Sequence, residues 1–100
     1  MKQYTNESQT AKLIELGFRE PKSKVGGKVI YEPDADLEIE WEEAYSIGEL
    51  IEMLSGVSEL EITRYGSGWE VGDDFRFCTN EELIDALYDM IIMIKEEGII

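Results

Sequence analysis

Hydrophobic residues recur every three or four positions in three stretches of the chain, which is the spacing of amphipathic helices. The first stretch runs from about Glu7 to Leu16, and Gly17, a typical helix-terminating residue, follows it. The second begins after Ser46, which together with Glu49 has the spacing of a capping box, and it ends at Gly56. We therefore expect two short helices, each with its own start and stop signals.

The third stretch is the longest and the most hydrophobic. Thr79 and Glu82 repeat the capping-box spacing, and residues that favour helices continue from Asn80 to Glu97, where Gly98 follows. Apolar residues cover more of this segment than the single stripe that faces one sheet. We expect a long C-terminal helix that is wedged between a sheet and the other two helices.

Between the second and third helices, apolar and polar residues alternate with the two-residue period of half-buried strands. Two glycine-containing turns divide this segment, at Tyr65–Gly68 and Gly72–Asp74. The same alternation occurs earlier in the chain and predicts a fourth strand there. The expected strands are Leu60 to Thr63, Trp69 to Val71, Phe75 to Cys78 and Leu37 to Glu42, with Val29 to Tyr31 as a candidate edge.

These elements predict an α+β fold in a single domain over residues 1–100. It consists of a small antiparallel sheet of three to four strands with three helices, and the long C-terminal helix packs on one face. A chain of 100 residues, of which 43 % are hydrophobic, is long enough to fill a core without disulfides or metals. For the polar stretch from Arg19 to Lys28, a loop and a loose hairpin both remain open.

The charge balance restricts the function. The chain has 23 Asp and Glu, 9 Lys and Arg and no His, which gives a net charge of −14. Because nucleic acids and anionic lipids bind basic surfaces, we expect no direct contact with nucleic acid or a membrane. The absence of His removes the commonest general base and zinc ligand, and one Cys forms neither an internal disulfide nor a metal cage.

The first residues of the chain lack the apolar core of a signal peptide. The longest aliphatic run, Met90 to Ile94, is far shorter than the roughly 20 residues of a membrane span. Together with the single unpaired cysteine, these features predict a cytoplasmic protein.

Several helical segments carry a resemblance. They are Tyr45 to Ile51, Glu82 to Tyr88, Lys95 to Gly98 and Thr10 to Phe18. These segments, about half of the chain, resemble small uncharacterised proteins of phages and integrated mobile elements of Bacteroides-like gut bacteria. The resemblance implies a mobile-element context, and it implies no activity or functional residue.

A tract of acidic residues at alternate positions is the most distinctive feature of the sequence. If the tract is extended, its side chains share one face at intervals of roughly 6.6 Å. Such a ladder is either the solvated face of an edge strand or a surface that binds a basic partner, for example by imitating a nucleic-acid backbone. The candidate binding residues are Asp34, Asp36, Glu38, Glu40 and Glu42.

The same tract offers the first three acidic positions of an EF-hand loop at Asp34, Asp36 and Glu38. However, Ile39 stands where that loop requires Gly, and Tyr45 stands where it requires Glu. We therefore expect no metal site. No motif indicates a cofactor either.

The third helix is the second candidate interaction surface. Tyr88, Ile91 and Ile92 widen its apolar face, and they predict either burial in the core or contact with an apolar partner, including a homodimer.

Cys78 directly precedes this helix, where the helix dipole lowers a thiol pKa, but no His is present to pair with it. A small buried hydrophobe is the better interpretation. We therefore expect no catalytic residue and interpret the chain as a non-catalytic protein-protein interaction module. The alternatives are an acidic decoy that mimics nucleic acid and occupies a basic DNA- or RNA-binding protein, and a carboxylate-based enzyme.

Overall fold

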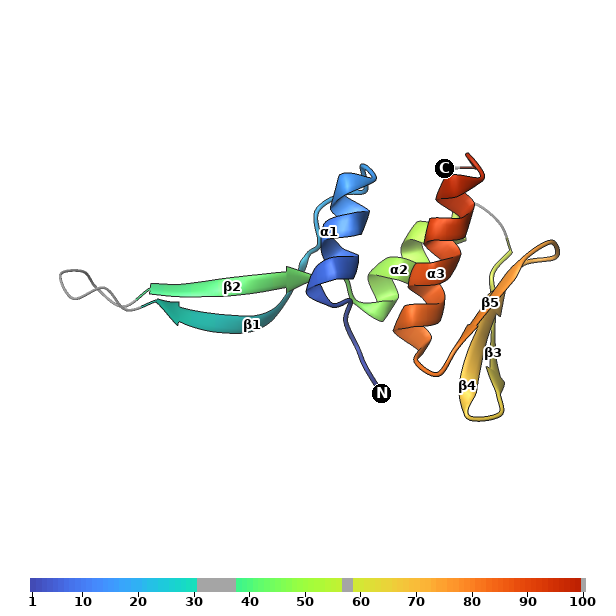
Figure 1. Cartoon of the computed structure of the whole chain (residues 1–100), viewed down its shortest axis with the longest axis horizontal. Coiled ribbons are helices and arrows are strands. Elements are labelled where there is room, and N and C mark those ends of the chain that lie inside the picture. The colour runs from blue at the N-terminus through green and yellow to red at the C-terminus, as the bar shows by residue number, and fades with distance from the viewer. Residues whose placement is uncertain (31–37, 57–58, 100) are drawn as a thin grey trace.

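The computed structural model describes residues 1–30, 38–56 and 59–99, and for residues 25–30 and 38–41 it describes the backbone only. The fold is α+β, as the sequence predicts, and the described part contains three helices and two antiparallel sheets (Figure 1). The helices are α1 (Glu7–Glu15), α2 (Ile47–Ser55) and α3 (Leu83–Glu96). The strands are β1 (Ser23–Ile30), β2 (Glu38–Ala44), β3 (Glu61–Tyr65), β4 (Gly68–Gly72) and β5 (Phe77–Asn80).

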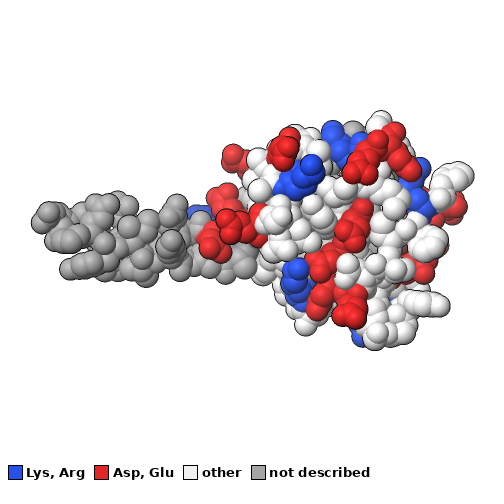
Figure 2. Space-filling view, in the orientation of Figure 1, with Lys and Arg blue, Asp and Glu red and all other residues white. Residues whose placement is uncertain are grey.

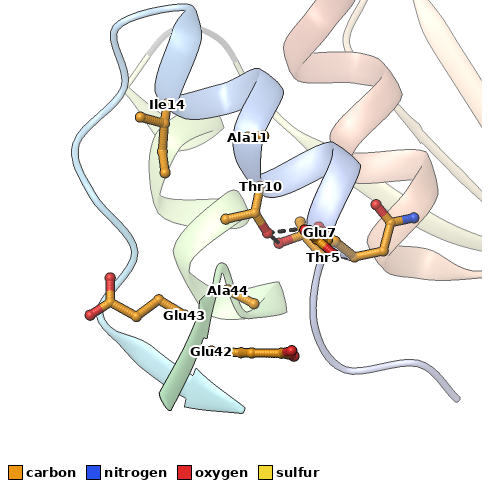
Figure 3. Close-up of a pocket in the computed structure, with 9 residues that line it drawn as sticks. Thr5, Glu7, Thr10, Ala11, Ile14, Glu42, Glu43 and Ala44 are labelled. Atoms are coloured by element: carbon orange, nitrogen blue, oxygen red, sulfur yellow. Dashed lines mark hydrogen bonds between the residues drawn. The ribbon is translucent and has the colours of Figure 1, made fainter. Parts of the chain in front are cut away.

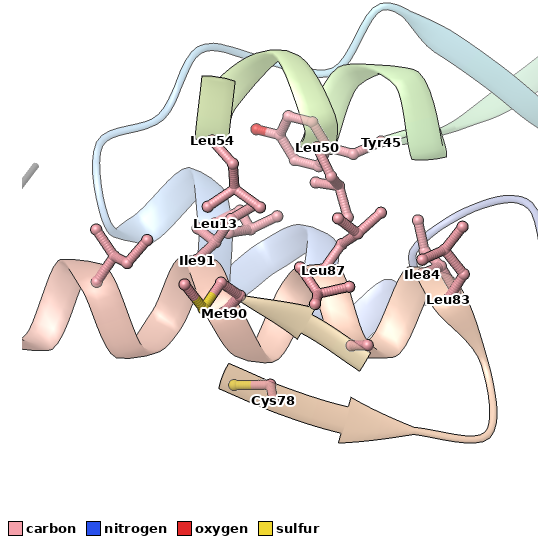
Figure 4. Packing of buried hydrophobic residues seen from close by; sticks show 13 residues of the cluster. Leu13, Tyr45, Leu50, Leu54, Cys78, Leu83, Ile84, Leu87, Met90 and Ile91 are labelled. Carbon is pink, nitrogen blue, oxygen red and sulfur yellow. The ribbon is translucent and has the colours of Figure 1, made fainter. Parts of the chain in front are cut away.

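The core forms around α3, which packs against α2 on one side and against β4 and β5 on the other (Figure 4). The seven buried residues of α3 form the broad face of the helix that meets these two layers. Leu13 of α1, Leu50 of α2 and Val71 of β4 meet this helix and are fully buried. Removing a buried side chain of this size costs about 2–5 kcal/mol of stability, so this cluster supports the body of the molecule.

Side-chain caps fix the starts of the first two helices. Asn6 Oδ1 accepts a hydrogen bond from the Gln9 backbone N–H at 2.8 Å, and Ser46 Oγ accepts one from the Glu49 N–H at 3.2 Å. In each case the third helical residue bonds back to the backbone of the cap. The predicted capping box at Ser46 is therefore confirmed.

The predicted start of α3 is wrong. Thr79 lies in β5, where it is the partner of Glu70 on β4, and α3 begins only at Leu83. Glu82 is the N-cap, and its side chain makes no cap hydrogen bond. Cross-strand pairing holds residues 77–80 in extended backbone, and this tertiary pairing overrides the local capping signal.

The predicted fourth strand exists as β2, but it pairs with β1 and lies outside the three-stranded sheet. This resolves the open question about the polar stretch in favour of a hairpin. The β1–β2 hairpin extends away from the body as an arm, and the three-stranded sheet lies at the opposite end (Figure 1). The Cα radius of gyration is 16.1 Å, compared with about 13 Å for a compact chain of this length. Within the described ranges, none of the helices is long and apolar enough to cross a membrane.

Candidate functional site

A groove of about 380 Å³ separates α1 from the body end of β2 (Figure 3). One face of α1 forms one wall, with residues spaced four and three apart so that they lie on the same side of the helix. The end of β2 forms the other wall. The lining residues are Thr5, Asn6, Glu7, Thr10, Ala11, Ile14, Glu42, Glu43 and Ala44.

Hydrogen bonds around Thr5 hold the two walls together. The Thr5 backbone N–H donates to the Tyr45 carbonyl at 2.9 Å, and the Tyr45 N–H donates to Thr5 Oγ1 at 3.0 Å. Thr5 Oγ1 is also 2.7 Å from Thr10 Oγ1, and this second hydroxyl donates to the Asn6 carbonyl. Since these groups are buried, the bonds fix the start of α1 against the strand that carries the arm.

The base of the arm is also attached to α2. Glu49 accepts hydrogen bonds from Ser23 Oγ at 2.6 Å and from the Lys22 backbone N–H at 3.1 Å. Burial alone would raise the pKa of Glu49, but these bonds and those from Ser46 outweigh burial and lower the pKa below its usual value. The Tyr45 hydroxyl donates to the Arg19 carbonyl nearby. The groove therefore lies beside a well-anchored hairpin.

The floor of the groove is apolar. Ala11 and Ile14 come from α1, and Ala44 comes from the end of β2 (Figure 3). The side chain of Ile14 is 44 % exposed, whereas the adjacent Leu13, which points in another direction from α1, is fully buried. The groove thus offers aliphatic surface that the folded chain does not cover.

The rim of the groove is acidic. Glu7, Glu42 and Glu43 are exposed, and none of their carboxylates makes an ion pair or hydrogen bond with another described side chain. Lys24 is the partner of Glu43 in the hairpin register, yet the two form no ion pair. Among the described side chains, these three carboxylates therefore border an open apolar floor without a cationic partner.

Some acidic groups elsewhere in the described ranges do have cationic partners. Lys2 Nζ lies 2.8 Å from Asp85 Oδ1, and Arg19 pairs with Glu52 at 2.9 Å. Arg76 contacts both Asp73 and Glu97. These ion pairs use several of the few cations of the chain, and all of them lie outside the groove. Figure 2 shows acidic side chains gathered where the arm meets the body.

The structure describes only some of the residues of the predicted acidic ladder. Asp34 and Asp36 lie outside the described residues. Glu38 and Glu40 lie on β2, and the alternation of a strand puts these positions on the same side as Glu42. Glu42, whose side chain is described, lines the groove.

Sequence reasoning missed Glu7 and Glu43. Their place on the rim depends on how α1 packs against β2, and no local pattern in the chain encodes that contact.

The second candidate surface, on α3, is largely used by the core. Ile91 is fully buried, which agrees with burial in the core rather than contact with a partner at that residue. Tyr88 and Ile92 are partly buried and pack against the core cluster. The wide apolar coverage of the helix is explained by the wedge between α2 and the sheet, which the sequence also predicted.

Cys78 lies in β5, where it is buried. Burial, helped by the charge of Asp89, raises the pKa of its thiol. The thiol is therefore not activated by the helix dipole, and the interpretation as a small buried hydrophobe is confirmed. Among the residues that the structure describes, no group of three His, Cys, Asp or Glu side chains is arranged to hold a metal ion.

Comparisons of the chain with family models, with curated proteins and with solved structures found no match.

Proposed function

We propose that the protein is a non-catalytic binding module that takes a cationic segment of a protein partner in the groove between α1 and β2. The single observation that carries this proposal is an acidic rim, without a cationic partner among the described side chains, around an uncovered apolar floor. Glu7, Glu42 and Glu43 attract lysine or arginine side chains, and Ile14 offers a contact for an aliphatic side chain between them.

The size of the groove limits what it binds. A volume of about 380 Å³ holds one or two side chains, so the partner contributes a short segment. Burial of one leucine-sized side chain contributes about 1.5–3 kcal/mol. Each exposed charge pair contributes about 0.2–1 kcal/mol, because solvent screens it. The expected affinity is modest, and the partner's association is accelerated by the net charge of −14.

A second candidate function is the nucleic-acid-mimicking decoy. The alternation of Glu38, Glu40 and Glu42 along β2 favours it, because the three positions lie on one side of an arm that extends from the body. This function needs charge alone, whereas the binding module needs both charge and the apolar floor. The two functions therefore respond differently to changes in Ile14.

The test is a binding titration with a fluorescent peptide in which lysines flank one leucine, together with a matched peptide that has serine in place of leucine. We expect the Glu42→Gln, Glu43→Gln double variant to bind the leucine peptide about tenfold more weakly, which corresponds to two lost charge pairs. The control is Glu59→Gln, Glu96→Gln, which removes the same charge from exposed sites away from the groove. We expect this control to bind within about twofold of the wild type, since charges that far away are screened.

Ile14→Ser separates the two functions. If the protein is the binding module, Ile14→Ser weakens binding of the leucine peptide and leaves binding of the serine peptide unchanged. If it is the decoy, Ile14→Ser changes the affinity for neither peptide. In that case the wild-type protein also displaces duplex DNA from a basic DNA-binding protein. Equal weakening by both Glu→Gln double variants would contradict the groove as the binding site.

A further inference from the structure

The outer edge of β3 is open. β3 lies at the end of the strand order β3-β4-β5, and no strand in the described ranges pairs with its other side. All five residues from Glu61 to Tyr65 are exposed, with Ile62 at 37 % and Tyr65 at 70 %. Proteins usually protect such an edge with charged side chains, proline, a bulge or a covering element. β3 carries Glu61 and Arg64, but it contains no proline, and its register with β4 is unbroken.

The hairpin turn determines which backbone groups point outward. Tyr65 pairs with Gly68 across a two-residue turn, in which Gly66 has a φ of 58°. Such turns close with a hydrogen-bonded pair, so the backbone groups of residues 61, 63 and 65 face β4. The N–H and C=O groups of Ile62 and Arg64 therefore face the open edge. They provide two donors and two acceptors for a further strand.

The edge is complementary to itself. In an antiparallel pair of two β3 strands centred on Thr63, Ile62 of one copy lies opposite Arg64 of the other. Both residues direct their backbone groups to the edge, so the two pairs exchange hydrogen bonds. On the other face of the sheet, Glu61 lies opposite Tyr65. No charged residue then faces one of the same sign, which would destabilise the pairing.

Charge does not oppose contact between copies at this edge. Although the chain has a net charge of −14, β3 carries one acid and one base and is neutral as a segment. The guanidinium of Arg64 lies over the Trp69 ring, 4.9 Å from its centroid, which holds it on the strand. The sheet also lies at the end of the molecule opposite the acidic arm, so pairing through β3 keeps the two arms far apart (Figure 1).

We propose that two copies of the chain associate through their β3 edges and form a continuous six-stranded antiparallel sheet with a two-fold axis at Thr63. The interface is short, so it falls at the small end of specific interfaces and the dimer is weak. Its occupancy depends on concentration. Ile62 and Tyr65 become covered in the dimer, which accounts for apolar side chains on an otherwise solvated strand.

The first test is the molar mass by light scattering from about 10 µM to about 1 mM, a range that brackets weak association. We expect the mass to rise from 11.5 kDa toward twice that value. Ile62→Pro removes one donor from the open edge and leaves the β3–β4 bonds intact, so it abolishes the rise. Ile62→Ala is the matched control, because it loses the side chain but keeps the N–H group, and it still dimerises.

The second test is a crosslink at the axis. Non-hydrogen-bonded antiparallel partners have Cα atoms about 4.5 Å apart, within the range that a disulfide spans. We expect Thr63→Cys to form a disulfide-linked dimer on mild oxidation. Thr79→Cys, equally exposed on β5, does not. A mass of 11.5 kDa at all concentrations, an association that Ile62→Pro leaves intact, or equal crosslinking at both positions would overturn the proposal.

Discussion

Ser23 Oγ donates a hydrogen bond to Glu49 Oε1 over 2.6 Å, which joins the first residue of the arm to the first turn of α2. The same carboxylate also caps α2 through the backbone N–H of Ser46. One side chain therefore both starts a helix and attaches the hairpin whose other strand forms a wall of the groove. The position of the acidic rim depends on this attachment.

Replacing this carboxylate has a measurable cost. We expect Glu49→Gln to lower the free energy of unfolding by about 1–3 kcal/mol, because charge-assisted bonds to Ser23 and Lys22 are lost or weakened. Urea denaturation measures the change. Glu52→Gln is the control. Glu52 lies about one turn later in α2, is exposed and pairs only at the surface with Arg19, so this change shifts stability by less than about 0.5 kcal/mol. Equal effects of the two variants would refute the anchoring role.

Stability depends on pH through two carboxylates. Burial would raise the pKa values of Glu49 and Asp85, but hydrogen bonds lower both, in Asp85 from Lys2 and Gln9. A lowered native-state pKa means that the unfolded chain binds the proton more readily. The stabilisation is therefore present at neutral pH and is lost as the pH falls below about 4. Urea midpoints measured from neutral to acidic pH show this loss. Glu49→Gln and Asp85→Asn each make the fall of the midpoint at acidic pH, the acid limb of the curve, shallower. An unchanged limb in both variants would contradict the assignment.

Two glycines respond to alanine in opposite directions. At Gly72 a Cβ atom would lie 2.6 Å from the Arg76 carbonyl oxygen, so Gly72→Ala forces the β4–β5 turn to move and destabilises the protein by about 1–3 kcal/mol. At Gly56 the φ is −82° and no atom lies near the added Cβ. Gly56→Ala therefore stabilises the protein by about 0.4–1 kcal/mol by restricting the unfolded chain. Thermal melts of both variants provide the comparison, and a loss of stability in Gly56→Ala would show that this space is filled.

The thiol of Cys78 is protected in the folded protein. Because burial raises its pKa, we expect a thiol reagent at neutral pH to label it at least about a hundredfold more slowly in the native protein than in urea. With a reagent that releases a coloured leaving group, absorbance measures the labelling rate of the native protein and the rate in urea. Rapid labelling of the native protein would indicate that β5 opens readily or that the thiol is accessible.

Local signals in the sequence predict most of the elements. The cap at Ser46 and the glycine turn at Gly66 act within a few residues, so the structure forms them where the sequence places them. The signal at Thr79 is equally good locally, but pairing with Glu70 uses that residue in a strand. A local pattern shows that Thr79 is able to cap a helix, but it does not show that a distant strand pairs with the same residue.

The groove depends on contacts between distant parts of the chain. Its walls come from α1 and the end of β2, which are about 30 residues apart in the sequence. The alternation at Glu42 predicts an exposed acid, but the neighbouring Ile14 looks like a core residue of an amphipathic helix. Only the packed structure shows that this side chain is half exposed beside the carboxylates of the rim.

A nitrogen-15 NMR titration of the protein with the leucine peptide shows most directly whether the groove binds it. We expect the backbone amide signals of Ala11, Ile14, Glu43 and Ala44 to move progressively, while those of β3 to β5 stay in place. We also expect these movements to shrink as salt is raised, because the rim contributes through charge. Signals that move mainly on the three-stranded sheet, or none that move at low salt, would contradict the groove as the binding site.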